Sequence, residues 1–393
     1  MGRIYLDRNA ATPLHPDVLA AMLPFFKERF GNPQSLHGEG QSALEAVEDA
    51  RGRVARLIGA SASEIIFTSS GSEANNLAVK GMALAGRAKG THLVFSAIEH
   101  LSVLNAAKSL EKFGFRSTLV PVDGTGLIRP GSVEQALTKE TVLVSVMLAN
   151  SEVGAVEPVA EIAKLCRDRG IPFHTDAVAA AGVLPVDVRE LGVDALSLSG
   201  DQFYGPKGGA ALFLKKGIRL LPQIDGGIQE GGRRAGTENV AAIVGLGWAA
   251  EIALARRAER ETKAQALRDR LIDGLSRRIA HIVLTGPRNE RLPCHASFCV
   301  RFVEGEAMLL SLDMQGIAVS SGSACSSKSL KASHVLLAMG LDHATAQGSV
   351  VFSLLEDTTA EDIDFVLESF PPIVERLRKM SPLYTDYLKE NPQ

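Results

Sequence analysis

Short apolar runs alternate with longer amphipathic stretches along most of the chain. Buried strands are predicted at 64–68, 92–95, 141–147, 172–175, 195–198 and 210–213. Helical patterns lie between most of these runs, which is the arrangement of βα units on a largely parallel sheet. The sequence therefore predicts an α/β fold.

A long amphipathic helix rich in Arg and Glu is predicted at 251–278, where it would lead out of the sheet. Further strands are predicted at 281–284, 296–302 and 348–354, and helices at 305–314 and 360–378. Because these elements no longer alternate regularly, we expect a second, smaller α+β domain at the C-terminal end.

Composition narrows the functional classes. The chain has 393 residues, of which 46% are hydrophobic and 22% charged, so a disordered or low-complexity protein is excluded. The net charge of −3 gives no general attraction to nucleic acid or anionic membrane. The apolar run 240–250 is too short to span a bilayer, which needs about 20 residues. With no signal-peptide pattern and few scattered cysteines, we expect a cytoplasmic protein without a membrane span.

Two segments have the composition of anion-binding loops. Residues 67–76 run from a strand through a Ser/Gly turn into a helix, which suits phosphate, although an ordinary Ser-capped helix start remains an alternative. Residues 225–239 combine many glycines with two arginines and Thr237, and a plain surface connection is the alternative there. Asp176 ends a buried strand, where ligands of open α/β sheets bind, or it caps a helix.

Cys325 differs from the other cysteines. It lies in the small polar run 319–328, which favours a reactive thiol, and Lys328 nearby would favour the thiolate. Cys166, Cys294 and Cys299 lie in apolar contexts and are predicted to be core residues. The nine histidines form no HExxH motif and the cysteines no CxxC pair, so no metal site is predicted.

Taken in order, a series of segments spanning the chain resembles the cysteine desulfurases, pyridoxal-phosphate (PLP) enzymes of the class V aminotransferase family. The matching segments are 4–13, 31–33, 68–76, 99–100, 150–154, 174–177, 203–208, 229–239, 304–306 and 320–325. The sequence Ser-Ser-Gly-Ser-Ala-Cys at 320–325 is similar to that of the subgroup that serves iron–sulfur cluster assembly.

The resemblance implies a fold-type I PLP transferase. It would have a large domain with a mainly parallel seven-stranded sheet over 15–255, and a smaller α+β domain formed by 1–14 and 256–393. It also implies a homodimer that passes sulfur to an iron–sulfur scaffold or a sulfur-carrier protein.

The same resemblance assigns roles to individual residues. Gly71, Ser72, Ser199 and Thr237 would hold the PLP phosphate. His100 would stack on the ring and act in catalysis, Asp176 would pair with the pyridine nitrogen, and Asn150 would lie at the substrate. Cys325 would take sulfur from L-cysteine as a persulfide and leave L-alanine.

Several positions depart from the family pattern. Gln202 stands where the family has the lysine that forms the internal Schiff base, and an amide is neither nucleophilic nor basic. Asp201 replaces a histidine, Ala179 a glutamine that contacts the cofactor, and Ser151 an asparagine. Val351 replaces the arginine that grips the substrate carboxylate, and an apolar side chain cannot form that bidentate pair.

Two interpretations stay open. In the first, the protein is a cysteine desulfurase with impaired or altered catalysis that uses noncovalently bound PLP. In the second, it is a non-catalytic member whose fold and Cys325 segment act as a sulfur acceptor, a cluster ligand or a partner scaffold.

Overall fold

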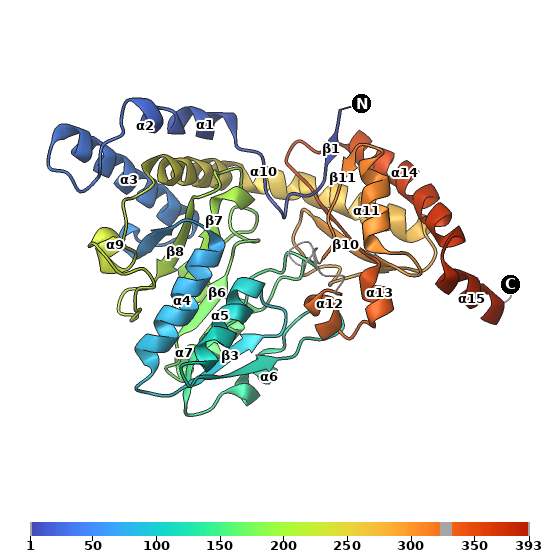
Figure 1. The fold of residues 1–393 in the computed structure, drawn as a ribbon, viewed down its shortest axis with the longest axis horizontal. Coiled ribbons are helices and arrows are strands. Elements are labelled where there is room, and N and C mark those ends of the chain that lie inside the picture. The colour runs from blue at the N-terminus through green and yellow to red at the C-terminus, as the bar shows by residue number, and fades with distance from the viewer. Residues whose placement is uncertain (1, 323–331, 392–393) are drawn as a thin grey trace.

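The large part of the molecule is built on a seven-stranded sheet (Figure 1). The computed structural model describes residues 2–322 and 332–391. The sheet strands are β2 (Ile65–Thr68), β3 (His92–Ser96), β4 (Arg116–Val120), β5 (Thr141–Ser145), β6 (Phe173–Asp176), β7 (Ala195–Ser199) and β8 (Ala210–Leu214). Their order is β2-β8-β7-β6-β5-β3-β4, and only β8 runs antiparallel to its neighbours. The predicted α/β class and mainly parallel sheet are confirmed.

Helices cover both faces of this sheet. They are α3 (Gly38–Leu57), α4 (Gly71–Gly86), α5 (Leu101–Glu111), α6 (Pro130–Ala136), α7 (Val159–Asp168) and α8 (Val188–Leu191). One apolar cluster joins α4 and α5 to the sheet, and another joins α3, α7 and α8 to it. With both faces buried, polar side chains at the carboxyl ends of the parallel strands gather along one edge.

Helix α10 (Val240–Arg278) connects the large sheet to a second set of elements. There β9 (Ile282–Leu284), β10 (His295–Val300) and β12 (Ser349–Ser353) form an antiparallel sheet, which packs with α11 (Gly305–Asp313) and α14 (Ala360–Lys379). Near the start of the chain, β1 (Ile4–Tyr5) pairs with β11 (Ile317–Ala318), and Ile4 and Leu6 join this second apolar core.

The remaining elements are short. They are α1 (Pro16–Met22), α2 (Pro24–Lys27), α9 (Gln229–Gly232), α12 (His334–Ala338), α13 (His343–Gln347), α15 (Pro382–Glu390) and the 3₁₀ turns η1 (Ala62–Glu64) and η2 (Gly200–Gln202). Of these, η2 and α12 matter most for the site, because residues of both line the central cavity.

Two expectations from the sequence were wrong. The connecting helix begins at Val240 rather than at 251, because the apolar run 240–250 forms its first turns and is buried against α3 and α1 in the core of the large part. The list of predicted strands also lacked β4. That strand lies at the sheet edge and is half exposed, so its sequence lacks the continuous apolar run of the central strands.

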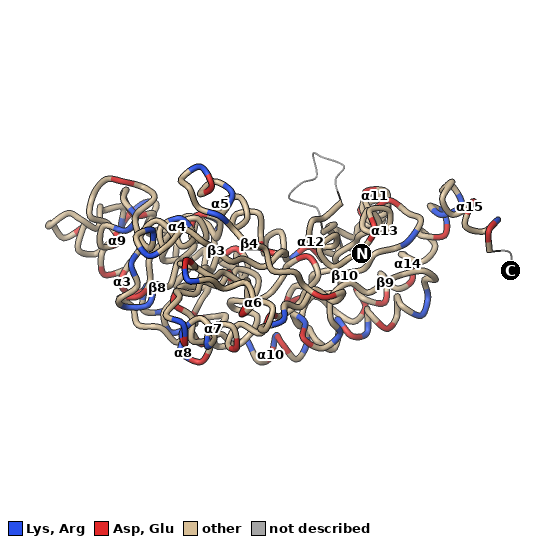
Figure 2. Tube along the Cα trace, turned by 90° about the horizontal axis from the view of Figure 1, so that it is seen from below, with Lys and Arg blue, Asp and Glu red and all other residues tan. Residues whose placement is uncertain are grey.

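Cys166, Cys294 and Cys299 are buried, as predicted. Lys and Arg alternate with Asp and Glu over the part of the chain that is described, including along α10 (Figure 2). Within the described ranges, no group of three or more His, Cys, Asp or Glu side chains is placed to hold a metal ion. Among the described helices, none combines the length and apolar character needed to cross a membrane.

Candidate functional site

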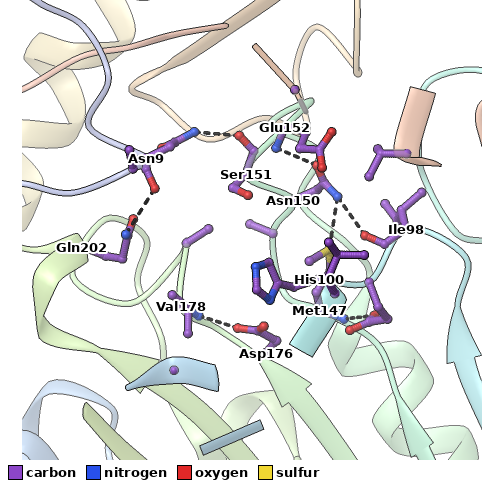
Figure 3. A pocket seen from close by; sticks show the side chains of 18 of the residues that line it. Asn9, Ile98, His100, Met147, Asn150, Ser151, Glu152, Asp176, Val178 and Gln202 are labelled. Carbon is purple, nitrogen blue, oxygen red and sulfur yellow. Dashed lines mark hydrogen bonds between the residues drawn. The ribbon is translucent and has the colours of Figure 1, made fainter. Parts of the chain in front are cut away.

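A cavity of about 610 Å³ is lined by residues at the carboxyl ends of the parallel strands and by residues of the second set of elements, among them Ser320, Ser333 and Val351. Its lining comes from the start of α4, from the segments that follow β3, β5, β6 and β7, and from residues near both ends of the sequence. We call Asn75, His100 and Asp176 the floor of the cavity, and Asp7, Asn9, Ser151, Gln202 and Val351 its rim. Figure 3 labels His100 and Asp176 of the floor and Asn9, Ser151 and Gln202 of the rim.

Asp176 is the central acid of the floor. It ends β6 and is buried. Its Oδ2 accepts a hydrogen bond from Asn75 Nδ2 at 2.6 Å, and its Oδ1 accepts one from the Val178 amide at 2.9 Å. Burial raises the pKa of Asp176, against the opposing effects of His100 and these two donors. A cationic nitrogen placed beside this carboxylate would offset the cost of burying its charge.

His100 is fixed at the first turn of α5. Its Nδ1 accepts a hydrogen bond from the Ser102 amide at 3.1 Å and lies 2.7 Å from Ser102 Oγ. Figure 3 shows the imidazole directed into the cavity beside Asp176. An aromatic ring held in this way offers a flat face to a planar ligand.

The start of α4 supplies an anion-binding element. Ser70 caps the helix, with its Oγ accepting a hydrogen bond from the Glu73 amide at 3.1 Å. The first amides of a helix have no partner within it, so those of Gly71 and Ser72 are available to a ligand. A Cβ atom on Gly71 would lie 2.6 Å from Val178 Cγ2, so only glycine fits at this point without displacing a neighbour.

Thr237 lies apart from this element in the single chain. It is exposed and does not line the cavity. Its glycine-rich loop is held by Arg234, whose Nε donates to Glu73 Oε1 at 2.9 Å, and by Glu230, which forms a buried ion pair with Arg51 at 2.7 Å. The structure thus brings Gly71, Ser72, Ser199, His100 and Asp176 to one cavity, but not Thr237.

Gln202 occupies the rim position where the resemblance implies a lysine. It lies in the turn η2 and is buried, and its Nε2 donates to the backbone carbonyl of Asn9 at 3.2 Å. Nearby, Ser199 Oγ donates to Asp201 Oδ1 at 2.5 Å. These residues hold one another by hydrogen bonds but offer no amine for covalent attachment of a ligand.

The other departures from the family pattern also line the cavity. Val351, in β12, and Ala179, after β6, present buried aliphatic surfaces. The carbonyl of Ser151 accepts hydrogen bonds from Asn9 Nδ2 at 2.7 Å and faces His295 Nε2 at 3.0 Å. Asn150 uses both ends of its side-chain amide: Oδ1 accepts from the Glu152 and Val153 amides of its own loop, and Nδ2 donates at 3.0 Å to the Ile98 carbonyl in the segment after β3.

Sequence reasoning missed two acids of the cavity lining, the buried Glu99 and the partly exposed Glu152. Glu99 precedes His100, and its Oε1 accepts a hydrogen bond from the Met147 amide at 2.7 Å, while burial raises its pKa well above the ordinary value. Burial raises the pKa of Glu152 to about 7, although Ser333 Oγ donates to it at 2.5 Å. Both acids follow sheet strands, which is the signal that could have identified them.

The cavity has an unusual balance of charge. Five carboxyl side chains line it, those of Asp7, Glu99, Glu152, Asp176 and Asp201. Among the described residues of its lining there is no lysine and no arginine. Cys325 lies outside the described residues; Gly322 and Ala332, the described residues on either side of that gap, both line the cavity.

Comparisons with known proteins agree on one family. The model of the aminotransferase class-V family matches residues 4–366. A cysteine desulfurase IscS of Clostridium botulinum is 49% identical over 98% of both chains. The structure of a NifS-like protein superposes with a TM-score of 0.90 at 36% identity, over 95% of this chain and all of the other. The apo structure of a cysteine desulfurase from Thermococcus onnurineus superposes with a TM-score of 0.85 at 26% identity, over 95% of each chain.

Proposed function

The chain belongs to the class V aminotransferases and, within them, to the cysteine desulfurases, and from this premise we propose that it is a sulfur-transfer protein with a noncovalently held PLP. Members of the family depend on PLP. The observation that carries the proposal is the contrast within one cavity between an ordered floor and a rim that has Gln202 in place of an amine.

The floor fits the cofactor. Asp176 is buried, needs a cationic neighbour and would pair with the pyridine nitrogen, while His100 would lie against the ring. The amides of Gly71 and Ser72, with Ser199, would hold the phosphate. When bound, PLP supplies an electron sink for carbanion chemistry at the substrate carbon.

The rim limits turnover. Gln202 cannot accept the substrate α-proton or bond covalently to the cofactor. The aliphatic side chain of Val351 cannot form hydrogen bonds or an ion pair with the substrate carboxylate. L-Cysteine turnover is therefore expected to be slow, with the net reaction of L-cysteine and the Cys325 thiol giving L-alanine and a Cys325 persulfide.

The proposal extends to the assembly and its partners. We place the protein in the cytoplasm as a homodimer, with the large and small domains bounded as the sequence predicts. An iron–sulfur scaffold or a sulfur-carrier protein would receive the persulfide sulfur, a step supported by the similarity to IscS desulfurases.

A second candidate is favoured by the missing amine and guanidinium in the described lining. In this alternative Cys325 receives sulfur from another persulfide-bearing protein and the cavity catalyses no reaction. Both candidates require Cys325, but only the first requires L-cysteine to deliver sulfur to it.

The test follows PLP and sulfur separately. PLP is added to the purified protein, and absorbance is recorded between about 320 and 450 nm before and after L-cysteine. Borohydride reduction and mass spectrometry should detect a covalent PLP adduct in Gln202→Lys but not in wild type. Radiolabelled sulfur from L-cysteine should appear on wild type and not on Cys325→Ser.

Two results would contradict the proposal. Failure of both wild type and Gln202→Lys to retain PLP would remove the cofactor site. Bound PLP without any labelled sulfur on Cys325 would leave the non-catalytic alternative.

A further inference from the structure

Two histidines, His100 and His334, are among the described residues that line the cavity. His334 is the first residue of α12, and its Nε2 lies 3.0 Å from the backbone carbonyl oxygen of Glu99. Because a carbonyl oxygen can only accept a hydrogen bond, Nε2 carries the proton, and the neutral ring has its lone pair on Nδ1. No other hydrogen bond joins the His334 side chain to the described part of the chain, so this lone pair is not engaged there.

His100 is held by its other ring nitrogen. Its Nδ1 accepts a hydrogen bond from the Ser102 amide at 3.1 Å, so the nitrogen left for a ligand is Nε2, which carries the proton in the neutral ring. His100 can therefore donate a hydrogen bond but has no spare lone pair, whereas His334 has one. Glu99 precedes His100, so one short segment after β3 fixes both rings.

The surroundings of His334 favour the neutral ring. Burial lowers the pKa of His334, with an opposing effect from the Glu99 carbonyl and a further lowering by His100. A neutral imidazole can accept a proton, whereas an imidazolium cannot. Within the described lining there is no lysine or arginine side chain that could take this role in its place.

The proposed reaction requires a proton acceptor in this cavity. Gln202 stands where the family has a lysine, and its amide is not basic. His100 is excluded by the hydrogen bond at its Nδ1, and Asp176 is assigned to the ring nitrogen of the cofactor. Glu152 is the competing acceptor, because its pKa of about 7 suits a general base.

We infer that Nδ1 of His334 accepts the proton from the α-carbon of the amino-acid substrate, the task that the missing lysine amine leaves open. The inference rests on the proposed function and adds a catalytic residue to it. In this step the bond between the α-carbon and its hydrogen breaks, the electron pair stays with the carbon, and the proton bonds to Nδ1. Return of a proton from Nδ1 to the same carbon restores the amino acid, so the step consumes no oxidant or reductant.

The experiment isolates this step from sulfur transfer by using L-alanine, which has no thiol. The purified full chain is mixed with PLP and L-alanine in heavy water, and proton NMR follows the loss of the α-hydrogen signal. The rate with PLP alone is subtracted. His334→Gln keeps an amide donor for the Glu99 carbonyl but has no basic nitrogen, so it should slow the exchange about 100-fold.

Three further variants control this result. His343→Gln makes the same change at an exposed position of α13 and should leave the exchange rate unchanged. Glu152→Gln removes the competing acceptor and should change the rate less than about threefold. Gln202→Lys, added to His334→Gln, supplies an amine and should restore the exchange, which a misfolded protein could not do.

A second measurement does not depend on activity. NMR of the protein with isotope-labelled histidine, prepared without PLP, reports which ring nitrogen carries the proton. The His334 signal, identified by its loss in His334→Gln, should show the proton on Nε2. Calorimetry should also give a PLP dissociation constant for His334→Gln within about twofold of the wild-type value.

The possible results separate the inference from the proposed function. Exchange that exceeds PLP alone and is lost in His334→Gln, with PLP affinity retained, supports the inference. Exchange unaffected by His334→Gln, exchange lost in Glu152→Gln instead, or a proton on Nδ1 of His334 overturns it. Bound PLP without exchange also overturns it, while labelled sulfur on Cys325 would still preserve the proposed function. Failure of wild type to bind PLP removes the proposed function and the inference together.

Discussion

The floor of the cavity is held together by its own side chains, whereas the rim is held mainly through backbone carbonyls. Asp176 accepts from the Asn75 side chain and His100 is fixed by Ser102, so the floor is ordered before a ligand arrives. Gln202 and Asn9 instead donate to the backbone carbonyls of Asn9 and Ser151. From this difference we expect that cofactor binding and catalysis can be separated in this protein by changing the floor or the rim alone.

The largest effect is expected when the floor is broken. Asp176→Asn removes the negative charge that would pair with the ring nitrogen, so affinity for PLP should fall about 100-fold. Fluorescence or calorimetric titration measures this loss. Asp386→Asn, at an exposed site on α15, is the matched control. An unchanged affinity in Asp176→Asn would show that the floor does not bind the ring.

The pH dependence of stability tests the raised pKa of Glu152. Burial raises the pKa of Glu152 from 4.5 to about 7 in the folded protein, so the folded state binds more protons than the unfolded chain within this range. The stabilisation from this protonation is present at low pH and is lost as pH rises through about 7. Glu152→Gln should therefore raise the free energy of unfolding by about 2 kcal/mol at pH 8 but change it little at pH 4.

Urea unfolding at the two pH values measures this difference. Glu259→Gln, at an exposed position of α10, should show no such pH dependence relative to wild type. Equal gains at pH 4 and pH 8 would contradict the assignment of a raised pKa to Glu152.

The rim can also be altered toward substrate binding. Val351→Arg would place a guanidinium in the cavity, and its bidentate pairing with a carboxylate should tighten L-cysteine binding about tenfold. Cysteamine, which lacks the carboxylate, should gain nothing. Calorimetry with both thiols measures the change, and an equal gain for cysteamine would exclude carboxylate pairing as its cause.

The smallest effect is expected at Thr237. Because this residue is exposed and does not line the cavity of its own chain, Thr237→Ala should change PLP affinity less than about twofold in a monomer. Light scattering during the titration reports the oligomeric state. A loss well beyond twofold in a dimeric sample would show that one copy completes the site of the other.

The sequence predicted the strands of the fold that are continuous runs of apolar residues. The buried strands of the sheet are apolar runs in the sequence, whereas β4 was missed because this half-exposed edge strand begins with three polar residues and has no continuous apolar run. His100 and Asp176 could be found because they follow such strands. Glu99 could not be recognised as buried from its residue type, since glutamate usually lies at the surface.

Helix α10 has residues in both apolar cores, with Leu246 buried in the first and Leu271 in the second. The helix therefore fixes the distance and the rotation between the two apolar cores, because each of its residues adds a rise of about 1.5 Å and a turn of about 100°. One residue inserted between these leucines would turn the distal apolar face out of its core and carry Val351 away from Asp176. Substitutions at exposed positions of α10 should consequently be tolerated more readily than insertions or deletions, because a change in helix length would move the two parts of the cavity lining relative to each other.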